Sequence, residues 1–157
     1  MILLDTSGLL AAMFKDQNQH EACARALREA EPPRVMSPFV LAELDYLIVK
    51  YAGVGAEIKF LNEILCSAYE VSPWTVEDLI SAHEVIRRYE ALRIGLADAS
   101  TVVLAEKHGI YDILTLDERH FRAMQPQGRR KGFRLLPADA PSPSGRRKTA
   151  ATKSLRP

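Results

Sequence analysis

Short apolar runs alternate along the chain with longer segments in which apolar residues recur at helical spacing. Five runs predict strands, at about 2–4, 34–36, 69–72, 113–116 and 133–136. The segments between them predict helices at about 7–15, 18–30, 38–51, 55–67, 75–92 and 96–107, with a short helical piece around Phe121. Because strands that alternate with helices favour parallel pairing, we expect an α/β fold: a three-layer α/β/α sandwich around a short, mostly parallel central sheet.

Several predicted helices carry recognisable end signals. Ser37 and Pro38 suit the N-cap and first position of one helix, and Gly53 and Gly109 follow the ends of two others. The helix over 75–92 has an apolar stripe that we expect to face the core: Val76, Leu79, Ile80, His83, Ile86 and Tyr89.

The size and composition of the chain limit its class. Its 157 residues, 47% of them apolar, suit one globular domain with a real core. The opening lacks a basic segment, and no stretch approaches the roughly 20 apolar residues of a membrane helix. Cys23 and Cys66 lack metal-ligand spacing, so we expect both to be small core residues in a reducing cytosol. The sequence therefore predicts a cytoplasmic protein that does not enter a membrane.

The net charge of +1 conceals an acidic body and a basic end. Residues 1–128 hold 12 Lys and Arg against 19 Asp and Glu, whereas residues 129–157 hold nine against one. An acidic body binds nucleic acid poorly by itself, unless part of its acid holds metal. From Ala138 the chain lacks apolar periodicity, so we expect a domain over 1–137 and a disordered basic tail over 138–157.

Acidic residues follow two of the predicted strands. Asp5 ends the run over 2–4, and Asp117 follows the run over 113–116. The carboxyl ends of parallel strands share one edge, where α/β proteins bind their ligands. Each residue has an alternative role as the cap of the next helix, and for either one alone capping is the simpler interpretation.

Two helices offer further carboxylates. Asp98 falls in the first turn of an apolar helix, where the helix dipole alone would favour it. Glu43 lies in the apolar segment PFVLAELDYLIV, where we expect it to be desolvated and to need a partner. Asp45 has similar neighbours, so the pattern does not choose between the two.

Four carboxylates from four segments would repel one another unless a cation neutralised them or some stayed protonated. Ligand sets made of oxygen atoms select hard ions such as Mg²⁺ or Mn²⁺. Such a site suits the hydrolysis of phosphodiester bonds.

Four pieces of the chain together resemble the PIN-domain ribonucleases, most closely the VapC-type toxins of toxin–antitoxin pairs. They are LLDTSGLL, SPFVLAEL, GLADASTVVLA and ILTLDERHF, in the family's order and spacing across about 1–136. The resemblance implies a metal-dependent endoribonuclease whose acidic positions fall on Asp5, Glu43, Asp98 and Asp117. It thereby selects Glu43 over Asp45.

The resemblance also implies partners and supporting residues. Ser7 and Thr115 match neutral oxygen positions beside the first and last acids, from which they would orient water or carboxylates. The implied cofactor is Mg²⁺, with Mn²⁺ as an alternative. The implied partners are an RNA substrate, a cognate antitoxin and a second copy of the chain in a homodimer.

Other residues have simpler explanations. We expect His83 to be a core or boundary residue, His120 to cap or pack, and Trp74 to pack beside a helix start. The competing function is a catalytically silent PIN-like domain that only binds RNA or protein. Phosphotransfer is disfavoured because Ser7 stands where haloacid-type phosphatases need a second Asp, and no phosphate loop with Gly-Lys-Ser/Thr exists.

Overall fold

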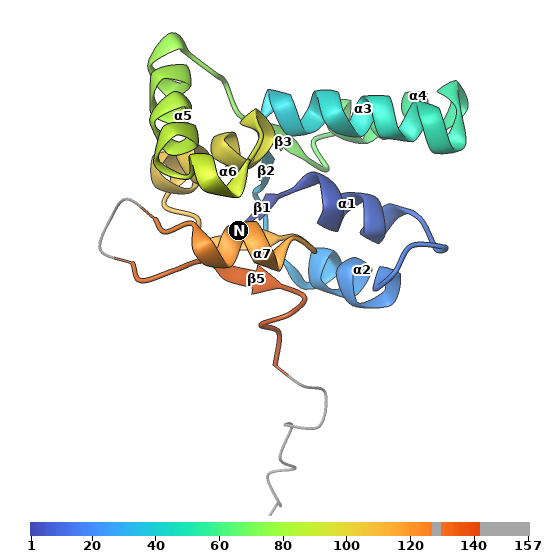
Figure 1. The fold of residues 1–157 in the computed structure, drawn as a ribbon. Helices are drawn as coiled ribbons and strands as arrows, with labels where there is room; N and C mark the ends of the chain where they lie inside the picture. The colour runs from blue at the N-terminus through green and yellow to red at the C-terminus, as the bar shows by residue number, and fades with distance from the viewer. Residues whose placement is uncertain (127–129, 142–157) are drawn as a thin grey trace, which may run out of the picture.

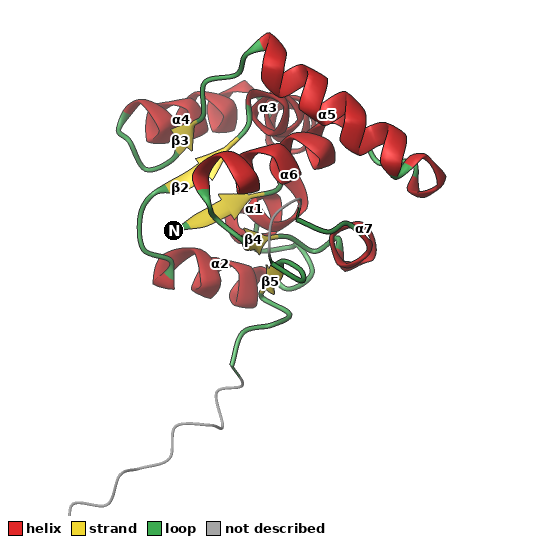
Figure 2. Ribbon diagram, turned by 90° about the vertical axis from the view of Figure 1, so that its left-hand side faces the viewer, coloured by secondary structure: helices red, strands yellow, loops and turns green. Residues whose placement is uncertain are grey.

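The computed structural model describes residues 1–126 and 130–141. Its centre is a five-stranded sheet in the order β3-β2-β1-β4-β5, in which every pairing is parallel (Figure 2). The strands are β1 (Ile2–Leu4), β2 (Arg34–Met36), β3 (Glu70–Val71), β4 (Asp112–Leu114) and β5 (Arg134–Leu136). The predicted α/β fold is confirmed, and the ends of β1 and β4 are neighbours.

Seven α-helices and one 3-10 turn connect the strands within the described residues (Figure 1). They are α1 (Thr6–Met13), α2 (His20–Glu29), α3 (Pro38–Ala52), α4 (Val54–Leu65), α5 (Val76–Arg88), η1 (Glu90–Leu92), α6 (Leu96–His108) and α7 (Glu118–Ala123). The end signals of α3 are confirmed: Ser37 Oγ accepts from the Val40 amide at 3.1 Å, and Pro38 opens the helix. Gly109 ends α6 with a φ of 65°, a conformation that favours glycine.

The alternation of side chains along each strand produces the two outer layers. Leu3 and Ile113 point to one face of the sheet, where they pack with residues of α5, α6 and α7. Ile2, Leu4 and Leu114 point to the other face and join residues of α1, α2 and α3. Because successive strand residues face opposite sides, a run of three apolar residues suits a strand that is buried on both faces.

Three sequence predictions about burial are wrong. In α5 the buried residues are Ala82 and Val85, whereas Val76, Leu79 and Ile80 are largely exposed. The side chain of His83 is 64% exposed, and Cys66 is exposed after the end of α4. The apolar pattern identified a real helix but selected the wrong face. The face that meets the core carries Ala82, whose small side chain gives only a weak hydrophobic signal.

The described part of the C-terminal segment contacts the domain. Asp139 forms an ion pair with Arg122 at 2.7 Å and accepts the Leu135 amide at 2.8 Å, and Ala140 packs against the core. Residues 142–157, most of the predicted tail, lie outside the described residues. No helix in the described ranges is long and apolar enough to cross a membrane.

Candidate metal site at the carboxyl edge of the sheet

Asp5 follows the last residue of β1 and is almost fully buried, with 5% of its surface exposed. Its Oδ2 accepts three hydrogen bonds, from the Ser7 amide at 3.2 Å, Ser7 Oγ at 2.6 Å and Thr115 Oγ1 at 2.8 Å. Asp5 therefore caps α1, which is the alternative role that the sequence offered for it. All three donors bind one oxygen, so the carboxylate is held rigidly while Oδ1 receives none of these bonds.

A glycine lets α1 lie directly on the end of β4. A Cβ atom at Gly8 would lie 2.3 Å from the carbonyl oxygen of Leu114, which no side chain could tolerate without a backbone shift. This close approach brings the start of α1 against the segment that follows β4. It thereby places Asp5 beside Thr115.

Thr115 links the two strand ends. Its hydroxyl donates to Asp5 and accepts the Asp117 amide at 2.9 Å, while Ser7 Oγ accepts the Leu116 amide at 2.9 Å. Ser7 and Thr115 thus connect the segment after β1 to the segment after β4. These are the two neutral positions expected beside the acids, and both contact Asp5.

Asp117 lies at the start of α7, where its Oδ1 accepts the His120 amide at 3.0 Å. Asp98 lies in the first turn of α6, where its Oδ2 accepts the Gly95 amide at 3.1 Å. Asp117 therefore has the capping role that the sequence offered as the alternative, and Asp98 has the expected first-turn position, from which it binds the N-cap amide. Capping fixes their positions and leaves carboxylate oxygens free for other contacts.

Glu43 approaches the same edge from α3. Its Oε2 accepts Thr6 Oγ1 at 2.6 Å, and its charge acts on Asp98. Asp45 instead lies beside Glu57 of α4, and this proximity raises the pKa of the Glu57 carboxyl. The structure therefore brings Glu43, and not Asp45, to the acidic group.

The expectation that Glu43 is desolvated is wrong, because the residue is exposed. Only Val40, Leu44 and Ile48 are buried in α3, at a spacing of four residues. The other faces of α3 also carry apolar residues, such as Tyr46 and Val49, but these are exposed.

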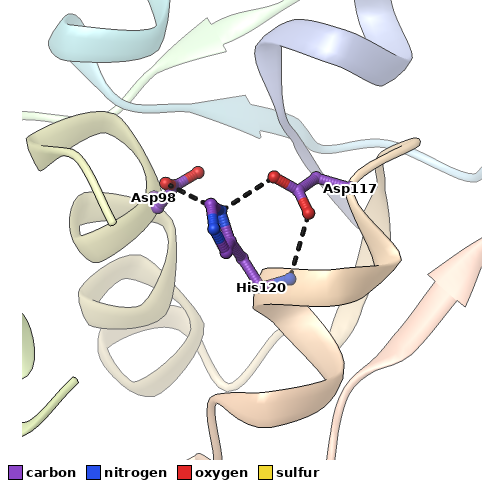
Figure 3. A group of neighbouring side chains, drawn as sticks. All are labelled: Asp98, Asp117 and His120. Carbon is purple, nitrogen blue, oxygen red and sulfur yellow. Dashed lines mark hydrogen bonds and ion pairs between the residues drawn. The ribbon is translucent and has the colours of Figure 1, made fainter. Parts of the chain in front are cut away.

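His120 is the site residue whose role the sequence did not indicate. Its imidazole lies between Asp98 and Asp117, as Figure 3 shows, with Nδ1 2.8 Å from Asp117 Oδ2 and 3.6 Å from Asp98 Oδ2. Nδ1 is buried and lies at ion-pair distance from Asp117 Oδ2, but it forms no directed hydrogen bond within the described residues. The expected capping role belongs to its backbone, while its side chain turns toward the acids.

Burial and mutual repulsion perturb the acids. Desolvation raises the pKa of Asp5 to about 6 against three hydrogen bonds that lower it, and the charge of Asp98 adds to the increase. Desolvation also raises the pKa of Asp98, with further contributions from the charges of Asp117 and Glu43. The four acids therefore lie close enough to interact, and in the absence of a cation they oppose one another's ionisation.

This donor set fits a divalent cation. Single donor atoms of Asp98, Asp117 and His120 lie within 4.8 Å of one another, which is close enough to surround one ion. Carboxylate oxygens are the preferred ligands of Mg²⁺ and Mn²⁺. A cation would also offset the repulsion that adds to the effect of desolvation on the pKa values of Asp5 and Asp98.

Comparisons with known proteins agree with this geometry. The chain is 39% identical over 127 residues to ribonuclease VapC26 of Mycobacterium tuberculosis, covering 81% of this chain and 94% of the relative. The crystal structure of VapC20 of M. tuberculosis, a Sarcin-Ricin loop cleaving toxin, superposes with a TM-score of 0.72 at 23% identity, covering 78% of this chain and 95% of that one.

A second structure shares the fold. VapBC2 from Rickettsia felis, solved bound to a DNA fragment from its promoter, superposes with a TM-score of 0.61 at 19% identity, covering 86% of this chain and 97% of that one. Residues 2–125 match the PIN domain family, a span that contains every acid of the site. The chain belongs to the PIN domain family.

Proposed function

We propose that the chain is a metal-dependent endoribonuclease toxin that is neutralised by a cognate antitoxin. The observation that carries the proposal is the meeting of Asp5, Glu43, Asp98 and Asp117, from four separate segments, at the carboxyl edge of a parallel sheet. The likeness to a ribonuclease along most of both chains supports the reaction class. The four acids are the proposed catalytic and metal-binding residues.

Each acid would act through a position that its own element fixes. Asp5 offers Oδ1 because its other oxygen is held by Ser7 and Thr115. Asp98 and Asp117 extend from helix starts, where the backbone amides orient them. Bound Mg²⁺ or Mn²⁺ would supply the Lewis acidity that activates water and neutralises charge on the phosphate.

Two exposed arginines close in sequence to the acids are proposed to hold the RNA backbone. Arg93 precedes the start of α6, and Arg119 lies in α7 two residues after Asp117. Both are exposed, and neither forms an ion pair within the described ranges. In a body with surplus acid, unpaired guanidinium groups on the segments that carry Asp98 and Asp117 suit phosphate contacts.

The experiment incubates the purified full chain, freed of antitoxin, with total RNA in Mn²⁺, Mg²⁺ or excess chelator, and maps the 5′ ends of the fragments. We expect cleavage at defined positions with metal and none with chelator. Binding of RNA without metal-dependent cleavage would instead support the competing function, a silent domain that only binds RNA or protein. The mapped ends would also identify the substrate RNA.

The antitoxin is proposed to lie along α3 and α4. These helices expose large apolar residues, including Tyr46, Ile58 and Leu65. Glu43 and Tyr46 lie one turn apart on α3, so a segment docked on Tyr46 leads directly to the acids. An arginine near the end of that segment would bind the carboxylates bidentately and displace the metal.

Calorimetry of antitoxin binding tests this arrangement. Tyr46→Ala and Ile58→Ser should each weaken binding by about tenfold or more, whereas Arg28→Ala, at an exposed position of α2 outside both proposed interfaces, serves as the control. Saturating Mn²⁺ should also weaken binding, because the metal and the arginine compete for the same acids. An inhibited complex that retains its metal would show that the antitoxin blocks access of RNA instead.

A homodimer in the cytosol is the proposed state of the free toxin. The proposal rests on the family resemblance and on the apolar surface of α5, which nothing in the described part of the chain covers. Light scattering of the antitoxin-free protein should give twice the mass of one chain. A monomer at micromolar concentration would contradict it.

A further inference from the structure

His120 occupies a position that capping and packing do not explain. Its side chain is 19% exposed, and its buried Nδ1 lies 2.8 Å from Asp117 Oδ2 without forming a directed hydrogen bond to any described residue. An imidazole nitrogen that faces two carboxylates in this way is placed to share a cation with them. Figure 3 shows the ring extending from α7 into the space between Asp98 and Asp117.

The distances around Nδ1 match the edges of a metal coordination sphere. At bond lengths of about 2.1 Å, donors at neighbouring corners of an octahedron lie about 3 Å apart. The separations from Nδ1 to Asp117 Oδ2 and to Asp98 Oδ2 are 2.8 and 3.6 Å, on either side of that value. One ion could therefore contact all three atoms with small side-chain adjustments.

We propose that His120 Nδ1 is a direct metal ligand and that this nitrogen makes the site prefer Mn²⁺ to Mg²⁺. Carboxylate oxygens suit both ions, whereas imidazole nitrogen suits transition metals and is a poor ligand for Mg²⁺. The inference deepens the proposed function, since it concerns the same site, but it predicts metal binding whether or not the chain cleaves RNA.

The test is pulsed electron paramagnetic resonance of Mn²⁺ bound to the full chain. Electron spin echo modulation detects a nitrogen bonded to the ion, and labelling histidine with ¹⁵N identifies its source. We expect a histidine nitrogen coupling in the wild-type protein that is lost in His120→Gln. It should persist in His83→Gln, the control, because His83 is exposed on α5.

Calorimetric titration gives a second readout. His120→Gln should lower the affinity for Mn²⁺ by about tenfold or more and change the affinity for Mg²⁺ much less. Bound Mn²⁺ without histidine coupling in the wild type would overturn the proposal, whatever the variant's stability. In that case the imidazole would only fill the space between the aspartates until the ion displaces it.

The result separates this inference from the proposed function. Nitrogen coupling in a protein that cleaves no RNA would support the ligand and reject the ribonuclease. Metal-dependent cleavage without nitrogen coupling would support the ribonuclease and reject His120 as a metal ligand.

Discussion

Asp5 and Asp117 occupy equivalent places at the ends of neighbouring strands, yet their surroundings differ. Both follow a strand and cap the next helix. Asp5 is buried with three donors on one oxygen, whereas the side chain of Asp117 is 33% exposed and accepts one backbone amide. The comparison shows a rigidly held carboxylate, Asp5, beside a more adjustable one, Asp117. Most of the cost of placing negative charge at this edge falls on Asp5, because it is buried.

Gly8→Ala should have the largest effect on stability, because it separates the two strand ends. The new Cβ would lie 2.3 Å from the carbonyl oxygen of Leu114, which forces α1 away from β4. We expect a loss of about 3 kcal/mol or more in the free energy of unfolding, measured by urea denaturation. Gly55→Ala is the control, since no atom of the described residues lies within 4 Å of its Cβ position. Equal effects of the two changes would contradict the close packing.

Asp5→Asn should stabilise the metal-free protein. Because the folded pKa is about 6 and the ordinary value is 3.8, the folded state binds the proton more tightly than the unfolded state. Stability contributed by protonated Asp5 is thus present below pH 4 and is lost as the pH rises through 6. Removing the ionisation should add about 3 kcal/mol at pH 8.

Urea denaturation with chelator at pH 4 and pH 8 measures this effect. The advantage of Asp5→Asn over the wild type should be large at pH 8 and small at pH 4, since Asn retains the capping oxygen. A variant that is less stable than the wild type at pH 8 would show that the carboxylate is stabilised in its buried site.

Thr115→Val should have an intermediate effect. It removes one donor from Asp5 and leaves the Asp117 amide without its acceptor, so about 1–2 kcal/mol of stability should be lost. Thr101→Val is a useful comparison, because Thr101 is also buried but donates only to the Ala97 carbonyl within α6. If Thr101→Val lowered the stability as much as Thr115→Val, the hydrogen bonds that link the two strand ends would contribute no more than an ordinary buried threonine.

Asp117→Asn should have the smallest effect on stability, under about 0.5 kcal/mol, because Asn caps helices as well as Asp does and keeps an oxygen that can face His120 Nδ1. Thermal unfolding in chelator at pH 8 measures it beside Asp5→Asn. A stabilisation as large as that expected for Asp5→Asn would remove the distinction between the two strand ends.

The sequence predicted the positions of the strands and helices better than it predicted which of their residues are buried. Strands such as Ile2–Leu4 were located because strands buried on both faces are short apolar runs, and α3 was located by Ser37 and Pro38. The apolar pattern of α5 failed because it marks which faces are apolar, not which face meets a neighbour. Burial depends on contacts between distant segments, which a local pattern does not contain.

The site shows a similar division. The spacing of Asp5 and Asp117 after strands predicted their meeting, whereas Glu43 could be separated from Asp45 only by family resemblance. For His120 the sequence favours capping or packing, because a histidine three residues after an aspartate is not part of a recognisable metal-binding motif. Its role depends on Asp98 of α6, which lies 22 residues earlier in the sequence. The two residues become neighbours only in the folded structure.

The central claim is that four acids from four segments form one metal-dependent catalytic site. It is tested most directly by cleavage of one defined RNA in Mn²⁺ by Asp5→Asn, Glu43→Gln, Asp98→Asn and Asp117→Asn, with Asp45→Asn as the control. We predict that each of the four loses about 100-fold or more of the cleavage rate while remaining folded, and that Asp45→Asn retains most of it. Near-native cleavage by three of the four variants, or an inactive folded Asp45→Asn beside an active Glu43→Gln, would contradict the assignment.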